Sequence, residues 1–232
     1  MNYAIIAAGE GSRLAQEGVK WPKPLVRLND TALIDRLIQI FLNNKATAIR
    51  VIVNEEMKEV QEHLRGLELS VPFHLLVKST PSSLHSFYEL CKDIESDEVC
   101  LTTVDTIFRE EEFGAYIDSF RKAKDLDGLM AVTDYIDDEK PLYVKTDKEL
   151  RILNFLDKTD GECRYISGGI YCLRQPAIAA LESAMGQGMS RLRNYQRHLV
   201  EKGLSLKAYP FSKIIDVDHA EDIAKAESFL KA

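Results

Sequence analysis

The segment AIIAAGEGSRL, residues 4–14, joins a short apolar run to a glycine-rich turn. The apolar run, residues 2–7, predicts a buried strand that enters a loop. In GEGSR the two glycines lie two positions apart, so backbone N–H groups can turn towards an anion with no Cβ in the way. Arg13 adds a guanidinium that can bind two phosphate oxygens at once. The segment therefore indicates a phosphate-binding loop, although a plain strand-to-helix turn explains GxGxR alone equally well.

Strand and helix patterns alternate through the first half of the sequence. Apolar residues with a 3.6-residue period predict a helix up to about Asn43, which Asp30 or Thr31 would cap. Further strands are predicted at residues 48–53, 73–78 and 98–104, and further helices at residues 55–65 and 82–94. This order predicts a parallel sheet with helices on both faces. Ligands of such sheets bind outside the carboxyl ends of the strands, so we expect residues 8–13 and Asp105 to lie on the same side.

The second half is richer in predicted strands. Strands are expected at residues 128–135, 141–145, 150–157, 163–173, 205–210 and 213–217, and helices at 176–185, at 190–202 and from His219 onwards. No linker-like segment separates the two halves. We therefore expect one domain over residues 1–232, with halves 1–125 and 126–232. Its fold class is predicted to be α/β: a Rossmann-like three-layer α/β/α sandwich with a mixed, mostly parallel sheet and a β-rich second lobe.

The composition limits the classes of partner. Of the 232 residues 45% are hydrophobic and 29% charged, as in ordinary globular proteins, and the net charge is −7. An acidic chain of this kind argues against a nucleic-acid surface. No stretch reaches the ~18 apolar residues of a membrane helix, so no membrane partner is expected. The cysteines show no CxxC spacing and are read as reduced, and the N-terminus lacks the basic region of a signal peptide, so the cytoplasm is the predicted compartment.

A second motif, WPKPL, follows the glycine-rich turn at residues 21–25. Lys23 lies between two prolines, which stiffen its backbone and let a flexible amine reach phosphate from a rigid support. GEGSR followed by PKPL resembles the signature of the sugar-1-phosphate nucleotidyltransferases, which is GxGxR, a variable loop and then PK. The broader group includes the phosphocholine cytidylyltransferases of bacteria. The resemblance extends over nearly the whole chain.

This resemblance implies roles for the residues of the two motifs. The loop would bind the triphosphate, and residues 1–125 would form the nucleotide-binding half. Arg13 and Lys23 would be catalytic and would stabilise charge on the phosphate under attack. The implied nucleotide-binding residues of the loop are Ala7, Ala8, Gly9, Gly11 and Ser12.

Two acidic segments resemble the metal-binding segments of the family. LTTVDTIF, residues 101–108, places Asp105 at the end of a predicted strand, and IIDVDHAEDI, residues 214–223, contains Asp216 and Asp218. The implied cofactor is Mg²⁺, which takes oxygen ligands and keeps several waters. Asp218 also has a purely structural interpretation, because with Glu221 it would form a capping box for the last helix. Which of Asp216 and Asp218 is the principal ligand stays open.

The acceptor half, residues 126–232, has weaker motifs. By resemblance LDKTD, residues 156–160, would use Lys158 for the acceptor phosphate and Asp157 for its hydroxyls, and ISGGIY, residues 166–171, would let substrate approach Gly169. Ser167 replaces the usual Asn of that strand, which makes a sugar acceptor less certain. Arg191, Arg193 and Arg197 follow along one predicted helix, where a solvated helix face is favoured over an acceptor site.

TPSSLHSF, residues 80–87, aligns with the base-reading loop of the family. Sugar enzymes usually carry a glycine where this chain has Ser83, and the segment resembles the NSxxSF-type sequence of phosphocholine cytidylyltransferases more closely. Ser82 and Ser83 are therefore candidate nucleotide-binding residues that would read a pyrimidine. Serine is equally common at helix starts, and the two interpretations have equal weight.

Taken together, the motifs predict an enzyme that transfers a nucleoside monophosphate from a nucleoside triphosphate (NTP) to a phosphorylated acceptor, a sugar 1-phosphate or a phosphocholine-like molecule, and releases pyrophosphate. The alternative is a non-catalytic nucleotide-binding regulatory domain. Retention of Lys23, Lys158 and all three aspartates favours the enzyme. A dinucleotide-binding oxidoreductase is disfavoured because Leu14 stands at the third glycine position of GxGxxG. The base, the acceptor and the oligomeric state are left open.

Overall fold

The predicted N-terminal strand lies inside the sheet, with a strand on each side. The computed structural model describes residues 1–231. Strand β1 (Asn2–Ile6) pairs in parallel with β4 (Ala48–Val53) and with β6 (Glu98–Thr103), and β4 pairs in parallel with β5 (Phe73–Val77). These strands confirm the expected parallel sheet of the first half, and all their carboxyl ends lie at one edge.

The helices of the first half begin later or end earlier than expected, but the three predicted ones are present. The helical elements are α1 (Ser12–Gln16), η1 (Lys23–Leu25), α2 (Leu33–Asn43), α3 (Lys58–Arg65), α4 (Ser83–Cys91) and α5 (Glu110–Lys122). Helix α5 was missed, although Phe113, Tyr116, Ile117 and Phe120 form one buried stripe on it. Their spacing is the i, i+3, i+4, i+7 pattern of a core-facing helix, so the signal was present in the sequence.

The predicted cap of α2 is wrong. Asp30 and Thr31 belong instead to a hairpin in which β2 (Arg27–Leu28) pairs with β3 (Thr31–Ala32). The turn between the strands consists of Asn29 and Asp30, both with positive φ, as a two-residue primed turn requires. The N-cap of α2 is Ala32, which makes no side-chain hydrogen bond to the helix. The turn preference of the Asn-Asp pair therefore overrode its capping preference.

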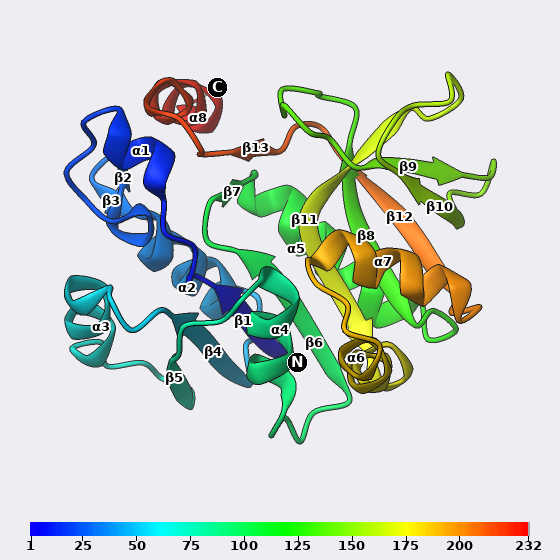
Figure 1. The fold of residues 1–232 in the computed structure, drawn as a ribbon, viewed down its shortest axis with the longest axis horizontal. Helices are drawn as coiled ribbons and strands as arrows, with labels where there is room; N and C mark the ends of the chain where they lie inside the picture. The colour runs from blue at the N-terminus through cyan, green and yellow to red at the C-terminus, as the bar shows by residue number, and fades with distance from the viewer. Residues whose placement is uncertain (232) are drawn as a thin grey trace.

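The second half joins the same sheet through one long strand. The short strand β7 (Thr106–Ile107) still belongs to the first half. The strands of the second half are β8 (Gly128–Thr133), β9 (Tyr143–Thr146), β10 (Ile152–Leu156), β11 (Tyr165–Arg174), β12 (Leu206–Phe211) and β13 (Ile215–Asp216), and its helices are α6 (Gln175–Gly186), α7 (Leu192–Glu201) and α8 (Ala220–Lys231). Strand β11 runs antiparallel to β6, β8 and β9, while β12 pairs in parallel with β8. The result is a mixed sheet of nine strands (Figure 1).

Strand β13 is much shorter than the predicted strand 213–217 and lies outside the main sheet. It pairs antiparallel with β7, so Asp216 lies opposite Thr106 and one residue along from Asp105. The segment after β6 thus carries both Asp105 and β7, which is the only strand that pairs with β13 among the described residues. This pairing brings the C-terminal aspartates to the carboxyl end of β6.

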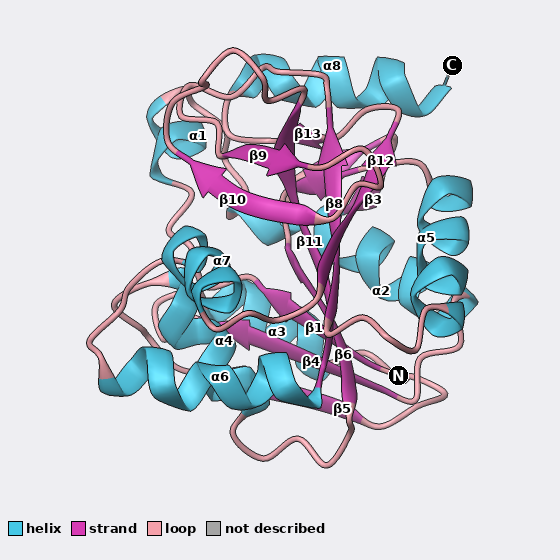
Figure 2. Ribbon diagram, turned by 90° about the vertical axis from the view of Figure 1, so that its right-hand side faces the viewer, coloured by secondary structure: helices cyan, strands magenta, loops and turns pink. Residues whose placement is uncertain are grey.

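Two cores lie on opposite faces of the sheet, as Figure 2 shows from the side. Tyr3 and Ile5 of β1 pack with α2, α3 and α5, whereas Ala4 and Ile6 pack with α4, α6 and α7. Side chains of a strand alternate between faces, so one strand contributes to both cores. The predicted α/β class with a layered, mixed sheet is confirmed. Among residues 1–231 no helix combines the length and apolarity needed to span a membrane.

Candidate active site

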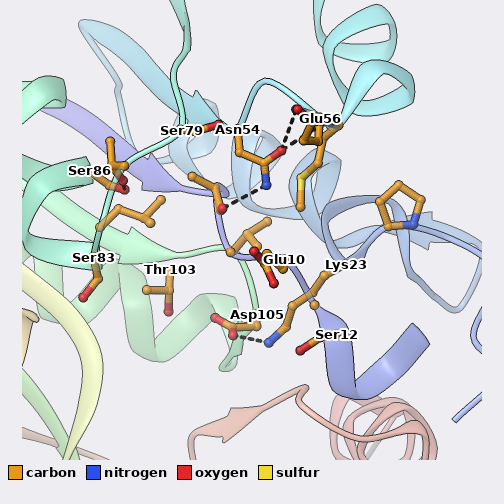
Figure 3. Close-up of a pocket in the computed structure, with 18 of the residues that line it drawn as sticks. Glu10, Ser12, Lys23, Asn54, Glu56, Ser79, Ser83, Ser86, Thr103 and Asp105 are labelled. Carbon is orange, nitrogen blue, oxygen red and sulfur yellow. Dashed lines mark hydrogen bonds and ion pairs between the residues drawn. The ribbon is translucent and has the colours of Figure 1, made fainter. Parts of the chain in front are cut away.

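A large cavity of about 980 Å³ opens at the carboxyl ends of β1, β4 and β6. We call it the large cavity (Figure 3). Its lining includes ten residues that the sequence had singled out: Ala8, Gly9, Gly11, Ser12, Arg13, Lys23, Ser82, Ser83, Asp105 and Asp218. The expectation that residues 8–13 and Asp105 share one edge is therefore confirmed. Ala7 lies beneath the loop, where it is buried and donates its backbone N–H to the Ile52 carbonyl at 2.9 Å.

Glycine is needed at the two positions of the loop for different structural reasons. Gly11 has φ +62°, and a Cβ there would lie 2.9 Å from Cβ of Lys23, closer than such atoms approach. A Cβ on Gly9 would meet no described atom within 4 Å, so that position is open towards the cavity. Gly11 thus permits the loop to pack against Lys23, whereas Gly9 leaves room for a ligand near the backbone.

Asn54 fixes the loop and was not predicted as a site residue. Its Nδ2 donates to the Ala8 carbonyl at 3.1 Å, and its Oδ1 accepts the backbone N–H groups of Glu56 and Met57 at 3.0 and 3.1 Å. The residue is 8% exposed and lies directly after β4. A buried amide with all these partners holds the loop rigidly against the entry to α3. An asparagine at the end of a buried strand was the available signal.

Lys23 is the centre of the charged groups in the large cavity. Its Nζ donates to Asp105 Oδ2 at 2.5 Å and to Asp218 Oδ1 at 2.6 Å, although 195 residues separate Lys23 from Asp218. The side chain enters from η1, next to Pro22 and Pro24, and the residue is only 9% exposed. Burial alone would lower the pKa of Lys23, but the two carboxylates outweigh it and raise that pKa.

The pKa values of Asp105 and Asp216 are shifted in opposite directions. Burial opposes ionisation of Asp105, yet the ion pair with Lys23 lowers its pKa. Loss of solvation and then repulsion by Asp105 and Asp218 raise the pKa of Asp216 to about 8. Asp216 is an exposed residue, so the repulsion by the two neighbouring carboxylates is the contribution that its surroundings explain directly. The difference follows from pairing: the ammonium of Lys23 contacts Asp105 but makes no ion pair with Asp216 within residues 1–231.

The carboxylate of Asp218 contacts cations and does not cap α8. Its Oδ2 accepts from Arg13 Nη1 at 3.2 Å, in addition to the contact of Oδ1 with Lys23. The backbone N–H groups of Asp218 and His219 are instead accepted by the Asp222 carboxylate, at 3.1 and 2.8 Å. The alternative of a capping box between Asp218 and Glu221 is wrong, because Asp222 occupies the place that was expected for Glu221.

The donor set suits a Mg²⁺ ion that is bound with its substrate. No three His, Cys, Asp or Glu side chains of residues 1–231 are grouped so that they hold a metal by themselves. Mg²⁺ in phosphate-handling sites usually takes one or two carboxylates, with substrate phosphates and waters as its other ligands. Asp105 and Asp218 already converge on one cationic atom, Lys23 Nζ. Asp105 and Asp218 therefore fit the two protein carboxylates of such a site, and the predicted metal-binding role of Asp216 stays a prediction.

A second cavity of about 520 Å³ adjoins the first and shares Arg13 and Asp218 with it. We call it the acidic cavity, because eight carboxylates line it: Glu17, Asp137, Asp138, Glu139, Asp216, Asp218, Glu221 and Asp222. Ser167 and Gly168 form part of its wall. A Cβ on Gly168 would lie 2.2 Å from Ile214 Cδ1, so this glycine allows the wall to close against the segment that leads to β13.

Gly169 has a packing role in this structure. Its φ is +74°, and a Cβ there would lie 3.1 Å from Thr106 Oγ1. It lines neither the large cavity nor the acidic cavity. Within the described chain it lets β11 approach the Thr103 and Thr106 hydroxyls, which are 2.8 Å apart. The predicted contact of Gly169 with the acceptor stays a prediction.

A third cavity of about 800 Å³ lies between the end of β10 and the start of α7. We call it the basic cavity, because five cationic residues line it: Lys140, Lys158, Arg191, Arg193 and Arg197. The predicted solvated helix face is wrong for Arg193 and Arg197, whose side chains are 30% and 24% exposed. Both pair with Asp157 Oδ1, at 2.9 and 2.7 Å, and lower the pKa of that carboxyl.

Ser82 and Ser83 line the large cavity but also hold another helix. Ser82 Oγ accepts the backbone N–H of Arg191 at 3.1 Å, and Ser83 Oγ accepts that of Leu192 at 3.2 Å. Each hydroxyl keeps its own hydrogen for a further acceptor, and Ser82 also contacts His85 Nδ1 at 2.9 Å. The serines thus cap α7 in place of their own helix.

Comparison with known proteins gives a consistent result. The family model described as "Nucleotidyl transferase" matches residues 3–232. The bifunctional protein GlmU of Thermodesulfovibrio yellowstonii is 26% identical over 247 residues, which cover 100% of this chain and 52% of that protein. GlmU of Synechococcus sp. strain JA-3-3Ab is 23% identical over 98% of this chain and 37% of its own length. The chain thus spans about half or less of the length of these curated relatives.

Solved structures share the fold over nearly the full length. The inositol-1-phosphate CTP transferase of T. maritima superimposes with a TM-score of 0.80 at 18% identity, covering 99% of this chain and 97% of that one. A putative glucose-1-phosphate thymidylyltransferase of Bacillus anthracis gives a TM-score of 0.83 at 17% identity, with 99% and 94% covered. At these identities the likeness establishes the fold alone.

Proposed function

Because this chain belongs to the nucleotidyl transferase family, we propose that it transfers a nucleoside monophosphate from an NTP to a phosphorylated acceptor and releases pyrophosphate. The observation that carries the proposal is the group formed by Lys23, Asp105 and Asp218 on the floor of the large cavity, beside the GEGSR loop. A buried ammonium between two carboxylates, next to a glycine-rich turn, suits a site for polyphosphate and a divalent cation.

The large cavity would bind the NTP. Its volume of about 980 Å³ is at the upper end of the range of small-molecule sites. The loop from Gly9 to Arg13 supplies backbone N–H groups and a guanidinium for the triphosphate. Across the cavity from Lys23, Ser79 and Ser83 would supply hydroxyls for a base (Figure 3), and Thr80 lines the same cavity. Hydroxyls both donate and accept, so this wall suits several bases.

In the proposed reaction an oxygen of the acceptor phosphate attacks the α-phosphorus of the NTP. A P–O bond forms to the acceptor, the P–O bond to the β-phosphate breaks, and its electron pair leaves with pyrophosphate. The nucleophile is already an anion near neutral pH, so no strong general base is required. Positioning and charge neutralisation then dominate, as in phosphoryl transfer generally. Lys23 and Arg13 would stabilise the charge on the phosphates.

Asp105 and Asp218 would hold Mg²⁺ when the NTP is bound, with Asp216 as a further candidate. The ion would supply neutralisation of phosphate charge. In the free protein Lys23 Nζ lies between Asp105 and Asp218. Its own interaction with these carboxylates must therefore weaken before it can contact phosphate. The arrangement keeps two buried carboxylates paired until the substrates arrive.

Two cavities of opposite charge flank the acceptor side. Lys158 of the basic cavity suits an acceptor phosphate, whereas the acidic cavity suits hydroxyls or a cationic group. A sugar 1-phosphate, an inositol phosphate and a phosphocholine-like molecule all satisfy this description. Ser167, which stands where the sugar enzymes of the family carry Asn, donates to Gln196 Oε1 at 3.1 Å. The hydroxyl is thus used within the protein.

The experiment is a pyrophosphate-release screen. The protein is incubated with Mg²⁺ and each of ATP, CTP, GTP, UTP and dTTP against phosphocholine, inositol 1-phosphate and several sugar 1-phosphates. We expect release for one base with one class of acceptor, and none when either partner is omitted. If no pair releases pyrophosphate while NTPs still bind by calorimetry, the transferase proposal fails, and a nucleotide-binding regulatory domain takes its place.

A further inference from the structure

Helix α7 contacts lining residues of the large cavity and of the basic cavity, and the proposed reaction gives the helix no role. In Figure 2 it lies between α4 and β10. Helix α4 begins at the nucleotide side of the large cavity, and β10 ends at the basic cavity. An element in this place can fix the distance between the two substrates.

On the nucleotide side, the start of α7 is held by serine hydroxyls. The contacts of Ser82 and Ser83 with the N–H groups of Arg191 and Leu192 satisfy donors that a helix start otherwise leaves unpaired. Arg191 has φ +66°, a conformation that non-glycine residues rarely adopt, so the entry to the helix is tightly defined. Farther along, the ring of Tyr195 packs edge-on against Phe87 of α4, with centroids 5.9 Å apart.

On the acceptor side, two arginines of α7 hold the end of β10. Arg197 contacts Asp157 Oδ1 with Nη2 at 2.7 Å and donates from Nε to the Phe155 carbonyl at 3.0 Å. Arg193 contacts the same Oδ1 at 2.9 Å and donates to the Lys140 carbonyl at 2.9 Å. Each guanidinium thus joins a carboxylate and a backbone carbonyl in a fixed geometry, which a lysine cannot reproduce.

A third contact of α7 reaches β11. Gln196 is 3% exposed and accepts a hydrogen bond from Ser167 Oγ, while its Nε2 donates to the Tyr171 hydroxyl at 3.1 Å. Buried polar groups that are fully paired specify one arrangement, because any shift leaves an unpaired amide. Consecutive turns of α7 are therefore tied to α4, β10 and β11.

We propose that α7 is a positioning helix, in which Arg193 and Arg197 hold Asp157 and the adjacent Lys158 at a set distance from the nucleotide-binding serines. The inference rests on the proposed function and gives these two arginines a role in placing the acceptor. They act through Asp157, so they are positioning residues. Within residues 1–231 both ion pairs of Asp157 use Oδ1, and Oδ2 remains for an acceptor hydroxyl.

The test compares Arg197→Met with Arg197→Lys, using the NTP and acceptor pair that releases pyrophosphate fastest in the screen. A misplacement of about 1 Å can cost about 100-fold in rate, so we expect Arg197→Met to lower kcat/KM for the acceptor between about 10-fold and 100-fold. Because the displaced residues are the ones proposed to bind the acceptor, a higher acceptor KM should account for part of this loss. The KM for the NTP should stay within about twofold, because the polar contacts of Arg197 go to Asp157, Phe155 and Asn194, and changes at separate sites are nearly additive. Arg197→Lys keeps the charge but loses the forked contact, so it should restore only part of the affinity. Arg151→Met, which removes an exposed arginine paired with Glu149, is the control.

A second readout separates this inference from the proposed function. Hydrogen exchange of residues 155–160 in the protein alone should be faster in Arg197→Met and unchanged in Arg151→Met. If the screen gives no product but this exchange difference is found, the transferase proposal fails and the positioning contact stands. Equal rises in both KM values, or an unchanged acceptor KM with unchanged exchange, would overturn the positioning role.

Discussion

The large cavity and the acidic cavity meet at Arg13 and Asp218, yet their carboxylates are in opposite situations. Asp105 faces the ammonium of Lys23, and its pKa is lowered. Asp216, on β13 opposite Thr106 of β7, forms no ion pair with that ammonium within residues 1–231, and its pKa is raised to about 8. The ion pair with Lys23 thus separates Asp105, whose pKa is lowered, from Asp216, whose pKa is raised. The acidic cavity, with eight carboxylates, keeps an excess of negative charge.

The largest effect on turnover is expected from removing Lys23, because Asp105 would then lack its cationic partner, as Asp216 already does in the described chain. Loss of one preorganised donor usually costs about 2.7–4 kcal/mol of transition-state stabilisation, so Lys23→Ala should lower turnover by at least about two decades. The fold should survive, as circular dichroism would verify. Lys20→Ala, an exposed lysine three residues earlier, is the matched control. Turnover of Lys23→Ala near the wild-type rate would remove the role given to this lysine.

The two C-terminal aspartates should differ in their effect on Mg²⁺. Asp218 shares its cationic partner, Lys23, with Asp105, whereas Asp216 does not. We therefore expect Asp218→Asn to raise the Mg²⁺ concentration for half-maximal activity by at least about tenfold. Even the loss of a residue that only contacts a metal ligand often has an effect of this size. Asp216→Asn should change it less. Mn²⁺ binding followed by electron paramagnetic resonance gives the same comparison without turnover. A larger effect of Asp216→Asn would make Asp216 the principal ligand.

The two loop glycines allow a finer test of the large cavity. Gly11→Ala forces a Cβ against Lys23 at positive φ, which should cost about 1–2 kcal/mol of stability and displace the lysine. Gly9→Ala meets no described atom, so its stability should stay within about 0.5 kcal/mol while NTP affinity falls. Urea unfolding and calorimetric titration with the NTP measure the two effects. Equal destabilisation by both changes would contradict the packing of Gly11 on Lys23.

The smallest effect concerns stability and pH. A carboxyl whose pKa is higher in the folded protein than in the unfolded chain favours folding at low pH, and this contribution is lost as pH rises through the folded value. Asp216→Asn should therefore stabilise the metal-free protein by an amount that grows between about pH 4, near the unfolded pKa, and about pH 8. Thermal melts in EDTA at several pH values test this. A stability gain that does not change with pH would show that the pKa of Asp216 is not raised in the folded protein.

Much of the nucleotide side was predictable because its information is local. GEGSR and PKPL lie within residues 9–25, and the end of a buried strand marks Asp105. The alternation of strand and helix patterns also predicted the parallel strands, because short continuous apolar runs fit a sheet that is buried on both faces. The hairpin at Asn29 and Asp30 was mispredicted because turn and cap preferences share the same residue types.

By itself the sequence determined the parallel sheet of the first half, the place of the glycine-rich loop after its first strand and a set of candidate charged residues. Only the tertiary structure decided which charges meet: that Lys23 pairs with Asp218 from 195 residues away, that Asp222 rather than Glu221 caps the last helix, and that Arg193 and Arg197 converge on Asp157. The physical reason is the range of the interactions. Periodicity and turn chemistry act over a few residues, whereas an ion pair depends on a distance of about 3–4 Å that only the completed packing of strands and helices defines.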